Sequence, residues 1–223
     1  MLVEALVADV GTRDVTEYYR LWPVQTPRTD GLGGLAGALV RLVHEVPVVA
    51  STRAEGWSSP ADVRTLPRDW SDLREPLAAD GWALAVPDVP APVADAFEDA
   101  GIPLAEVSAQ EMRAHLLGLA TAGLHTDLSV APAPSLRKRE WVTNLLKFCL
   151  SDGSLDLRGL PLALVSDGAL ERFGDRVHYI ALEQQRSLFR EHPDWFLDPE
   201  LPNRVPELSR IPGGYVVPMR LKH

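Results

Sequence analysis

Three side chains that lie close together in the sequence, Ser166, Asp167 and His178, have the types that nucleophilic hydrolysis requires. A serine nucleophile needs a histidine base, which a carboxylate orients. Ser166 and Asp167 lie in a predicted tight turn, however, where both side chains most simply bond to nearby backbone amides. The chain has no Gly-x-Ser-x-Gly elbow, and Cys149 lies in an apolar run without the polar setting of a reactive thiol. We therefore expect structural roles for these residues and no enzymatic activity.

A metal site would need histidine, cysteine or carboxylate ligands at short spacings. The candidates are His178, His192, Asp194 and Asp198. Their spacing fits no ligand motif, so we expect neither a metal nor a cofactor. Three other histidines are expected to be isolated on helix surfaces or in loops, namely His44, His115 and His125.

Aromatic residues beside proline and glycine corners are a further functional feature. Such residues are enriched at interfaces, where they give a large contact area and often one polar handle. The segment 192–199 frames two aromatic residues with acids and prolines, which is the composition of a docking surface. We predict that partners bind through Trp57, Trp195, Phe196 and Asp198. The alternative is that these aromatic residues hold loops onto their own core.

The elements that position these residues include a β-hairpin at 161–173. Two short apolar runs flank Ser166-Asp167-Gly168, and a two-residue Asp-Gly loop suits the primed turns of hairpins, in which Gly168 supplies the positive φ. Three further elements are predicted after it: a strand over 177–182, a helix over 183–190 and a last strand over 215–217.

Helices precede the hairpin. Ser108 and Glu111 form a capping box for a helix over 109–117. Ser135 is predicted to cap a second helix, which carries Cys149 near its apolar face and closes at 152–153. Shorter elements are predicted as a helix at 35–46, a strand at 47–51, a helix from 70 or 71 to 79, a strand at 82–86 and a helix at 92–100.

The order of these elements predicts an α+β fold, with short helices and small, mostly antiparallel sheets. Strands and helices alternate without the regular rhythm of a parallel, doubly wound sheet. The stretch 121–134 is rich in Ala, Pro and Gly and is the best candidate for a boundary. We predict an N-terminal lobe over 1–128 and a C-terminal lobe over 129–223, with one continuous domain as the alternative.

The composition restricts the partners. A formal net charge of -9 disfavours nonspecific binding to nucleic acid or anionic membranes. The basic run 137–139 is expected to be a solvated helix end, since Glu140 follows it. No stretch approaches the ~20 apolar residues of a membrane span, and the N-terminus shows no secretion signal. The single Cys149 excludes an internal disulfide, so we expect a reducing, cytoplasmic location.

Four motifs follow one another along the chain: PVV at 47–49, GWSSP at 56–60, LAVP at 84–87 and GLPLALVSDGALERFG at 159–174. Their succession, continued by VHYIAL and FLDPEL, resembles the repeats of sacsin and its bacterial relatives, which are large chaperone-like proteins. The resemblance covers the chain from about residue 18 to residue 200 and is strongest in the C-terminal part of such a repeat.

The resemblance implies a chaperone-like assembly in which such segments join an ATP-binding domain of the GHKL type. That nucleotide site needs an Asn-bearing helix and an Asp-x-Gly-x-Gly arrangement. Here Asp30-Gly31-Leu32-Gly33-Gly34 has its glycines one place out, and no Glu-x-x-x-Asn helix precedes it. We expect Asp30 to cap or turn into the following helix, and we expect no ATPase activity in this chain.

The sequence thus predicts a non-catalytic chaperone-like or scaffold module. Its partners would be a polypeptide client or other parts of its own assembly, with a GHKL domain as one such part. The alternative is an enzyme with a small-molecule pocket between the two lobes, in which an Asp or Glu and a His act as acid and base.

Overall fold

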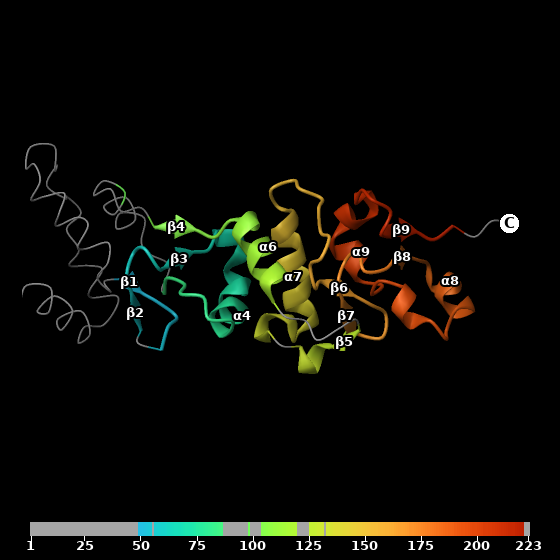
Figure 1. Cartoon of the computed structure of the whole chain (residues 1–223), viewed down its shortest axis with the longest axis horizontal. Helices are drawn as coiled ribbons and strands as arrows, with labels where there is room; N and C mark the ends of the chain where they lie inside the picture. The colour runs from blue at the N-terminus through green and yellow to red at the C-terminus, as the bar shows by residue number, and fades with distance from the viewer. Residues whose placement is uncertain are drawn as a thin grey trace, which may run out of the picture. The chain divides into compact units, whose positions relative to one another are not determined.

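The computed structural model describes residues 49–54, 56–86, 98, 104–119, 125–131 and 133–220 (Figure 1). These residues fall into two compact units, the first drawn from Met1–Arg74 and Gly81–Val107 and the second from Glu75–Asp80 and Ser108–His223. The main division follows residue 107, whereas the composition predicts it after residue 128. The predictions for 1–48, including the helix at 35–46, His44 and the Asp30 segment, and nearly all of the predicted helix at 92–100 lie outside the described residues.

Two short strand pairs form the frame of the first unit. β1 (Val49–Ala50) runs antiparallel to β2 (Trp57–Ser58), and β3 (Arg64–Thr65) runs parallel to β4 (Ala105–Glu106). The predicted strand at 82–86 is reduced to two bridges, which join Ala85 to Ser51 and Leu84 to Arg64. The core of this unit includes Val49, Val63, Leu66, Leu73, Leu84 and Val107.

The helix predicted to start at residue 70 or 71 is two helices. η1 (Arg68–Leu73) is a 3-10 helix that begins directly after Pro67, and α4 (Arg74–Ala79) continues it. Trp70 has non-helical backbone angles (φ -119°, ψ 19°), so η1 is kinked there. Proline is tolerated in the first turn of a helix, so Pro67 directly precedes η1 and Pro76 lies in the first turn of α4.

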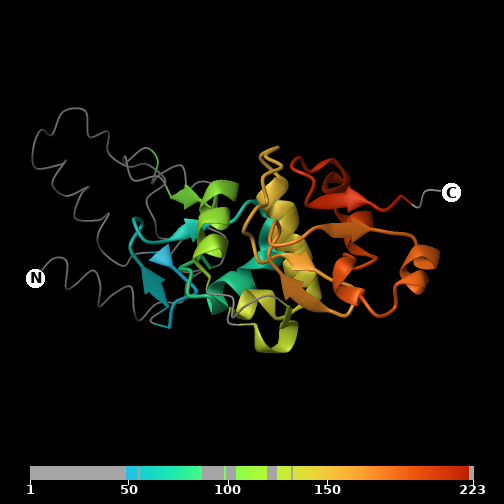
Figure 2. The ribbon, with the colours of Figure 1, turned by 45° about the vertical axis from the view of Figure 1, so that its right-hand side comes forward.

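Two helices pack against each other in the second unit (Figure 1, Figure 2). α6 (Ala109–Gly118) begins with the predicted capping box, in which Ser108 Oγ accepts from the Glu111 N–H at 3.1 Å and Glu111 accepts from the Ser108 N–H at 3.0 Å. α7 (Arg139–Leu150) buries one apolar face. The side chains that meet in this core include Met112, Leu116, Leu145, Leu146 and Phe148.

The predicted cap of α7 is wrong. Ser135 lies in a separate 3-10 turn, η3 (Pro134–Leu136), and its N–H donates to Asp80 Oδ1 at 3.0 Å. α7 begins only after Lys138, which has extended backbone angles. Pro134 at the first position favours a short turn of its own, and the buried Leu136 fixes that turn to the core.

The predicted hairpin is confirmed, but its loop is longer than predicted. β6 (Ala163–Leu164) and β7 (Ala169–Glu171) are antiparallel, with Ala163 opposite Glu171. The N–H of Val165 donates to the carbonyl of Ala169, and the N–H of Gly168 donates to that of Val165. This pattern encloses the three residues 166–168 and leaves Gly168 at φ +89°. A three-residue loop that ends in a left-handed glycine replaces the two-residue primed turn.

A third strand, from a part of the chain that precedes the hairpin, extends the hairpin sheet. β5 (Thr126–Asp127) pairs with β7, which gives the order β5-β7-β6. The predicted strand at 177–182 is β8 (His178–Ile180), which pairs in parallel with β9 (Val216–Pro218). Of the five pairings between strands in the described residues, three are antiparallel, so the fold is α+β with mostly antiparallel pairs.

Short helices fill the rest of the second unit. α8 (Glu183–Leu188) lies at the outer edge of this unit in both views (Figure 1, Figure 2). None of the helices in the described residues is both long enough and apolar enough to cross a membrane. The remaining helices are η2 (Leu128–Val130), α8 (Glu183–Leu188), η4 (Pro193–Trp195), α9 (Leu201–Arg204) and η5 (Pro206–Arg210).

Candidate functional site

A buried carboxylate, Glu171 at the end of β7, contacts three basic side chains. Its Oε2 lies 3.0 Å from His178 Nε2 and 3.0 Å from Arg176 Nε, and its Oε1 lies 3.2 Å from His125 Nδ1. The second ring nitrogen of His125, Nε2, lies 2.9 Å from Asp167 Oδ2. We call these five residues the Glu171 cluster.

Strand pairing places the members of this cluster. Thr126 lies opposite Leu170 in the β5–β7 pair, so the preceding His125 comes beside Glu171. His125 has φ +64°, which makes it the one non-glycine residue with positive φ in the described part of the chain. Such a conformation costs about 1–3 kcal/mol and persists where surrounding contacts impose it. The prediction that His125 is isolated is therefore wrong, as it is for His115, whose Nε2 lies 3.2 Å from Asp80 Oδ2.

The chemistry of the Glu171 cluster is that of a structural network of ion pairs and hydrogen bonds. Burial alone would raise the pKa of Glu171, but hydrogen bonds from His178 and His125 and the charge of Arg176 lower it below its ordinary value. The ionised carboxylate only accepts, so its partners donate. Both ring nitrogens of His125 face carboxylates, which leaves neither free to exchange a proton with a substrate. His178 Nδ1 is buried without a hydrogen-bond partner.

The serine, aspartate and histidine considered for hydrolysis do not form a triad in the structure. Asp167 Oδ1 accepts from the Ala169 N–H at 3.0 Å, and Ser166 Oγ donates to the Leu197 carbonyl at 3.3 Å. His178 is directed to Glu171. Cys149 is fully buried on α7, and burial raises the pKa of its thiol to about 12.

Two of the predicted partner-binding residues are buried. Phe196 and Asp198 are each 1% exposed. Phe196 bridges to Tyr179 of β8, and Asp198 forms an ion pair with Arg139 and accepts from the Glu200 N–H. These side chains hold the segment 192–199 onto its own unit. Arg139 begins α7 with its side chain 48% exposed, as expected of a solvated helix end, and it also pairs with Asp198.

Trp57 and Trp195, the other two predicted partner-binding residues, lie in different units. Trp57 is partly exposed in β2 of the first unit. Trp195 is 36% exposed at the end of η4, where its ring stacks on His192 at 4.2 Å between centroids. The centroids of the Phe189 and Trp195 rings lie 6.1 Å apart. Only the tryptophan of the predicted pair Trp195–Phe196 is therefore accessible.

Two exposed leucines lie at the ends of the same helix. Leu182, the N-cap of α8, is 71% exposed, and Leu188, its last residue, is 67% exposed. No residue of α8 is buried. Sequence reasoning missed both leucines, although two apolar side chains bracketing the polar run Glu183–Arg186 were a visible signal. We call Leu182, Leu188, Trp195 and the hollows described next the α8 face.

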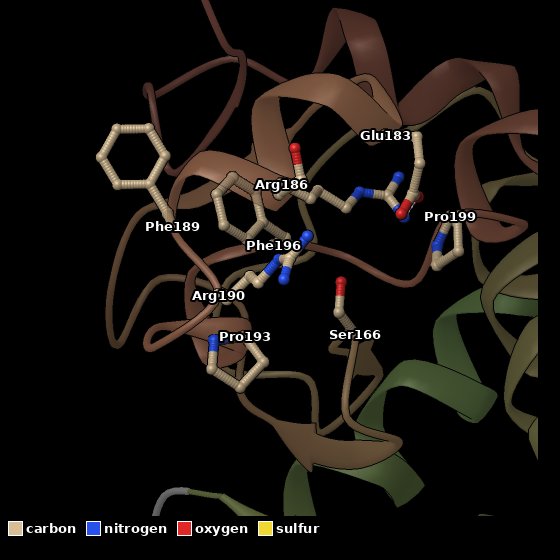
Figure 3. Close-up of a pocket in the computed structure, with 9 residues that line it drawn as sticks. Ser166, Glu183, Arg186, Phe189, Arg190, Pro193, Phe196 and Pro199 are labelled. Atoms are coloured by element: carbon tan, nitrogen blue, oxygen red, sulfur yellow. Dashed lines mark ion pairs between the residues drawn. The ribbon is translucent and has the colours of Figure 1, made fainter.

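Two hollows flank α8. One has a volume of about 500 Å³ and the other about 470 Å³, and both are lined by Glu183, Arg186 and Pro199. Figure 3 shows the first, with Ser166, Arg190, Pro193 and Phe196 around it. The second continues past Leu182 to Met219, the residue after β9. The first hollow thus combines two guanidinium groups with aromatic and proline walls.

The candidate metal ligands have other partners in the structure. His192 stacks on Trp195, Asp194 forms an ion pair with Arg176, and Asp198 is buried. Within the described residues, no group of three or more His, Cys, Asp or Glu side chains is placed to hold a metal ion. No family model matches the chain, nor does any curated protein or solved structure. The resemblance to sacsin repeats stays a prediction, and a function has to be argued from this chain's own side chains.

Proposed function

We propose that this chain is a non-catalytic module that binds polypeptide through the α8 face. The observation that carries the proposal is that two exposed leucines bracket a helix flanked by two hollows. Leu182 lines the second hollow, and Leu188 lies between Ser187 and Phe189, which line the first. Apolar side chains that gather around a concave surface mark interaction sites more often than scattered ones do. Trp195 adds an aromatic ring of the kind that dominates binding energy at protein interfaces.

The arrangement of the hollows suits an extended chain. They share three lining residues and so follow one another around α8. Successive side chains of an extended segment point to opposite sides, so alternate residues of one partner would enter neighbouring hollows. We propose that the partner is a client polypeptide or another part of the same assembly, including the GHKL domain that the sacsin resemblance implies.

An acid–base enzyme is the competing function. His125 would be its accessible imidazole, since its side chain is 42% exposed. Both of its nitrogens are engaged by carboxylates, however, and this favours the binding module. We place the module in the cytoplasm, a location that suits a single cysteine without a disulfide partner.

The proposal is tested with fluorescein-labelled unstructured peptides of acidic, neutral and basic sequence and equal apolar content. Fluorescence anisotropy would report binding to the wild-type chain and to the variants Leu182→Ser and Leu188→Ser. Because both leucines are exposed, these variants should fold normally. We expect each to weaken binding about tenfold, the effect of losing one buried leucine contact.

Val130→Ser is the matched control, because Val130 is 69% exposed but lies on η2. It should bind like the wild type. Equal weakening by all three substitutions, or no binding of any peptide, would contradict the proposal. Turnover of a small molecule that is lost in His125→Gln would favour the enzyme instead.

A further inference from the structure

Resting on the proposed function, we infer that the α8 face selects polypeptide segments in which a carboxylate stands next to an apolar side chain. Arg190 and Arg186 would hold the carboxylate, and the aromatic and proline walls of the first hollow would receive the apolar neighbour. The inference concerns the chemistry of the partner at this face, which the proposed function leaves open.

Arg190 supplies a free cation. It is exposed, lines the first hollow, and makes no hydrogen bond or ion pair within the described residues. Figure 3 shows its guanidinium group directed into the hollow, toward the Ser166 hydroxyl. A guanidinium group forms paired hydrogen bonds with a carboxylate, which fixes the orientation of the ligand as well as its charge.

Arg186 supplies a second cation. Only some of its guanidinium nitrogens have hydrogen-bond or ion-pair partners within its own unit. Its Nη2 donates to the Ala181 carbonyl at 2.8 Å, while Nη1 lies 4.0 Å from Glu183 Oε2. Its Nε is buried without a hydrogen-bond partner. Burial lowers the pKa of Arg186 from its ordinary value. A bound carboxylate would offset the cost of keeping this charge in a largely buried position.

The walls of the hollow favour a peptide over a polyanion. Phe189, Phe196, Pro193 and Pro199 line it beside the two arginines. The carboxylate of Glu183 lines the same hollow, with its side chain 88% exposed, and would repel a ligand that brings several negative charges there. A chain of net charge -9 also disfavours nucleic acid at long range. A ligand with one carboxylate beside one apolar group best matches these two arginines, the single Glu183 carboxylate and the apolar walls.

The experiment compares two labelled peptides that differ only in Asp→Asn replacements beside their leucines. For the wild-type chain, anisotropy titrations should give about fivefold tighter binding of the Asp peptide, and added salt should reduce the difference. Arg190→Gln should remove the preference and leave binding of the Asn peptide unchanged. Arg210→Gln is the matched control, because Arg210 is exposed on η5 and is likewise unpaired among the described residues.

The outcomes separate the two proposals. Equal binding of both peptides to the wild-type chain would overturn the carboxylate preference while the polypeptide-binding function stood. A preference that survives in both Arg190→Gln and Arg186→Gln would also overturn it. Binding of neither peptide would instead remove the proposed function itself. Tighter binding of a single-stranded oligonucleotide than of either peptide would contradict the choice of polypeptide.

Discussion

His178 donates a hydrogen bond from Nε2 to the Glu171 carboxylate at 3.0 Å, and both side chains are 0% exposed. The bond joins β8 to β7, strands that belong to different sheets. It therefore connects the hairpin sheet to the β8–β9 pair. The segment that carries Trp195 contacts the same pair, because Phe196 bridges to Tyr179 of β8. We expect the stability of the α8 face to depend on this buried polar contact.

Glu171→Ala should destabilise the fold by about 3 kcal/mol, because it leaves the buried His178 without its acceptor and removes the ion pair with Arg176. Urea unfolding followed by circular dichroism would measure the loss. Glu207→Ala is the control, since Glu207 is exposed on η5, and it should change stability by no more than about 0.5 kcal/mol. Equal effects of the two substitutions would show that the Glu171 cluster contributes little.

Stability should fall on acidification. The pKa values of Glu171 and Asp80 lie below their ordinary values of 4.5 and 3.8. For Asp80, burial acts in the opposite direction, and hydrogen bonds from His115 and Ser135 outweigh it. A depressed pKa in the folded state means that these carboxylates stabilise the fold above their ordinary pKa values.

That stabilisation is lost as the pH falls through the folded-state pKa. Unfolding free energies measured across the acid range should decline from about pH 4.5 downward and decline less steeply in Glu171→Gln. An identical slope in the variant would contradict the role of Glu171.

Cys149 should not react while the chain is folded. Burial raises the pKa of its thiol to about 12, so the reactive thiolate is scarce and enclosed. Labelling with Ellman's reagent should be slow in buffer and should accelerate with urea in step with unfolding. Fast labelling of the native chain would mean that the core around α7 opens readily.

Gly168→Ala should destabilise the hairpin by about 1 kcal/mol, because Gly168 has φ +89°. The cost is conformational, since an added Cβ would lie 3.7 Å from Arg139 Nη2, an ordinary contact distance. Gly118→Ala is the control, because Gly118 ends α6 with open space around it. It should be neutral or stabilising, and thermal unfolding would show whether the two variants differ.

Local signals in the sequence are enough to predict several elements. The capping box of α6 depends on Ser108 and Glu111, three residues apart. The hairpin is bracketed by apolar runs around Gly168, and Cys149 is buried as its apolar neighbours predict. Each of these features is decided by contacts within a few residues of the chain.

The Glu171 cluster could not be predicted in the same way. His125 meets Glu171 only because β5 pairs with β7 across 46 positions of sequence. Strands of two or three residues are too short to show a recognisable alternation, so neither that pairing nor the parallel pair of β8 and β9 is visible beforehand. Trp195 and Phe196 separate because Phe196 has extended backbone angles and bridges to β8, which turns neighbouring side chains in opposite directions.

The most direct measurement of the central claim is amide hydrogen exchange, read by mass spectrometry with and without the Asp-containing peptide. The account predicts slower exchange in residues 182–196 of the second unit and unchanged exchange in β1 and β2 of the first. Protection confined to the first unit, or a bound peptide that leaves α8 and η4 unprotected, would contradict it.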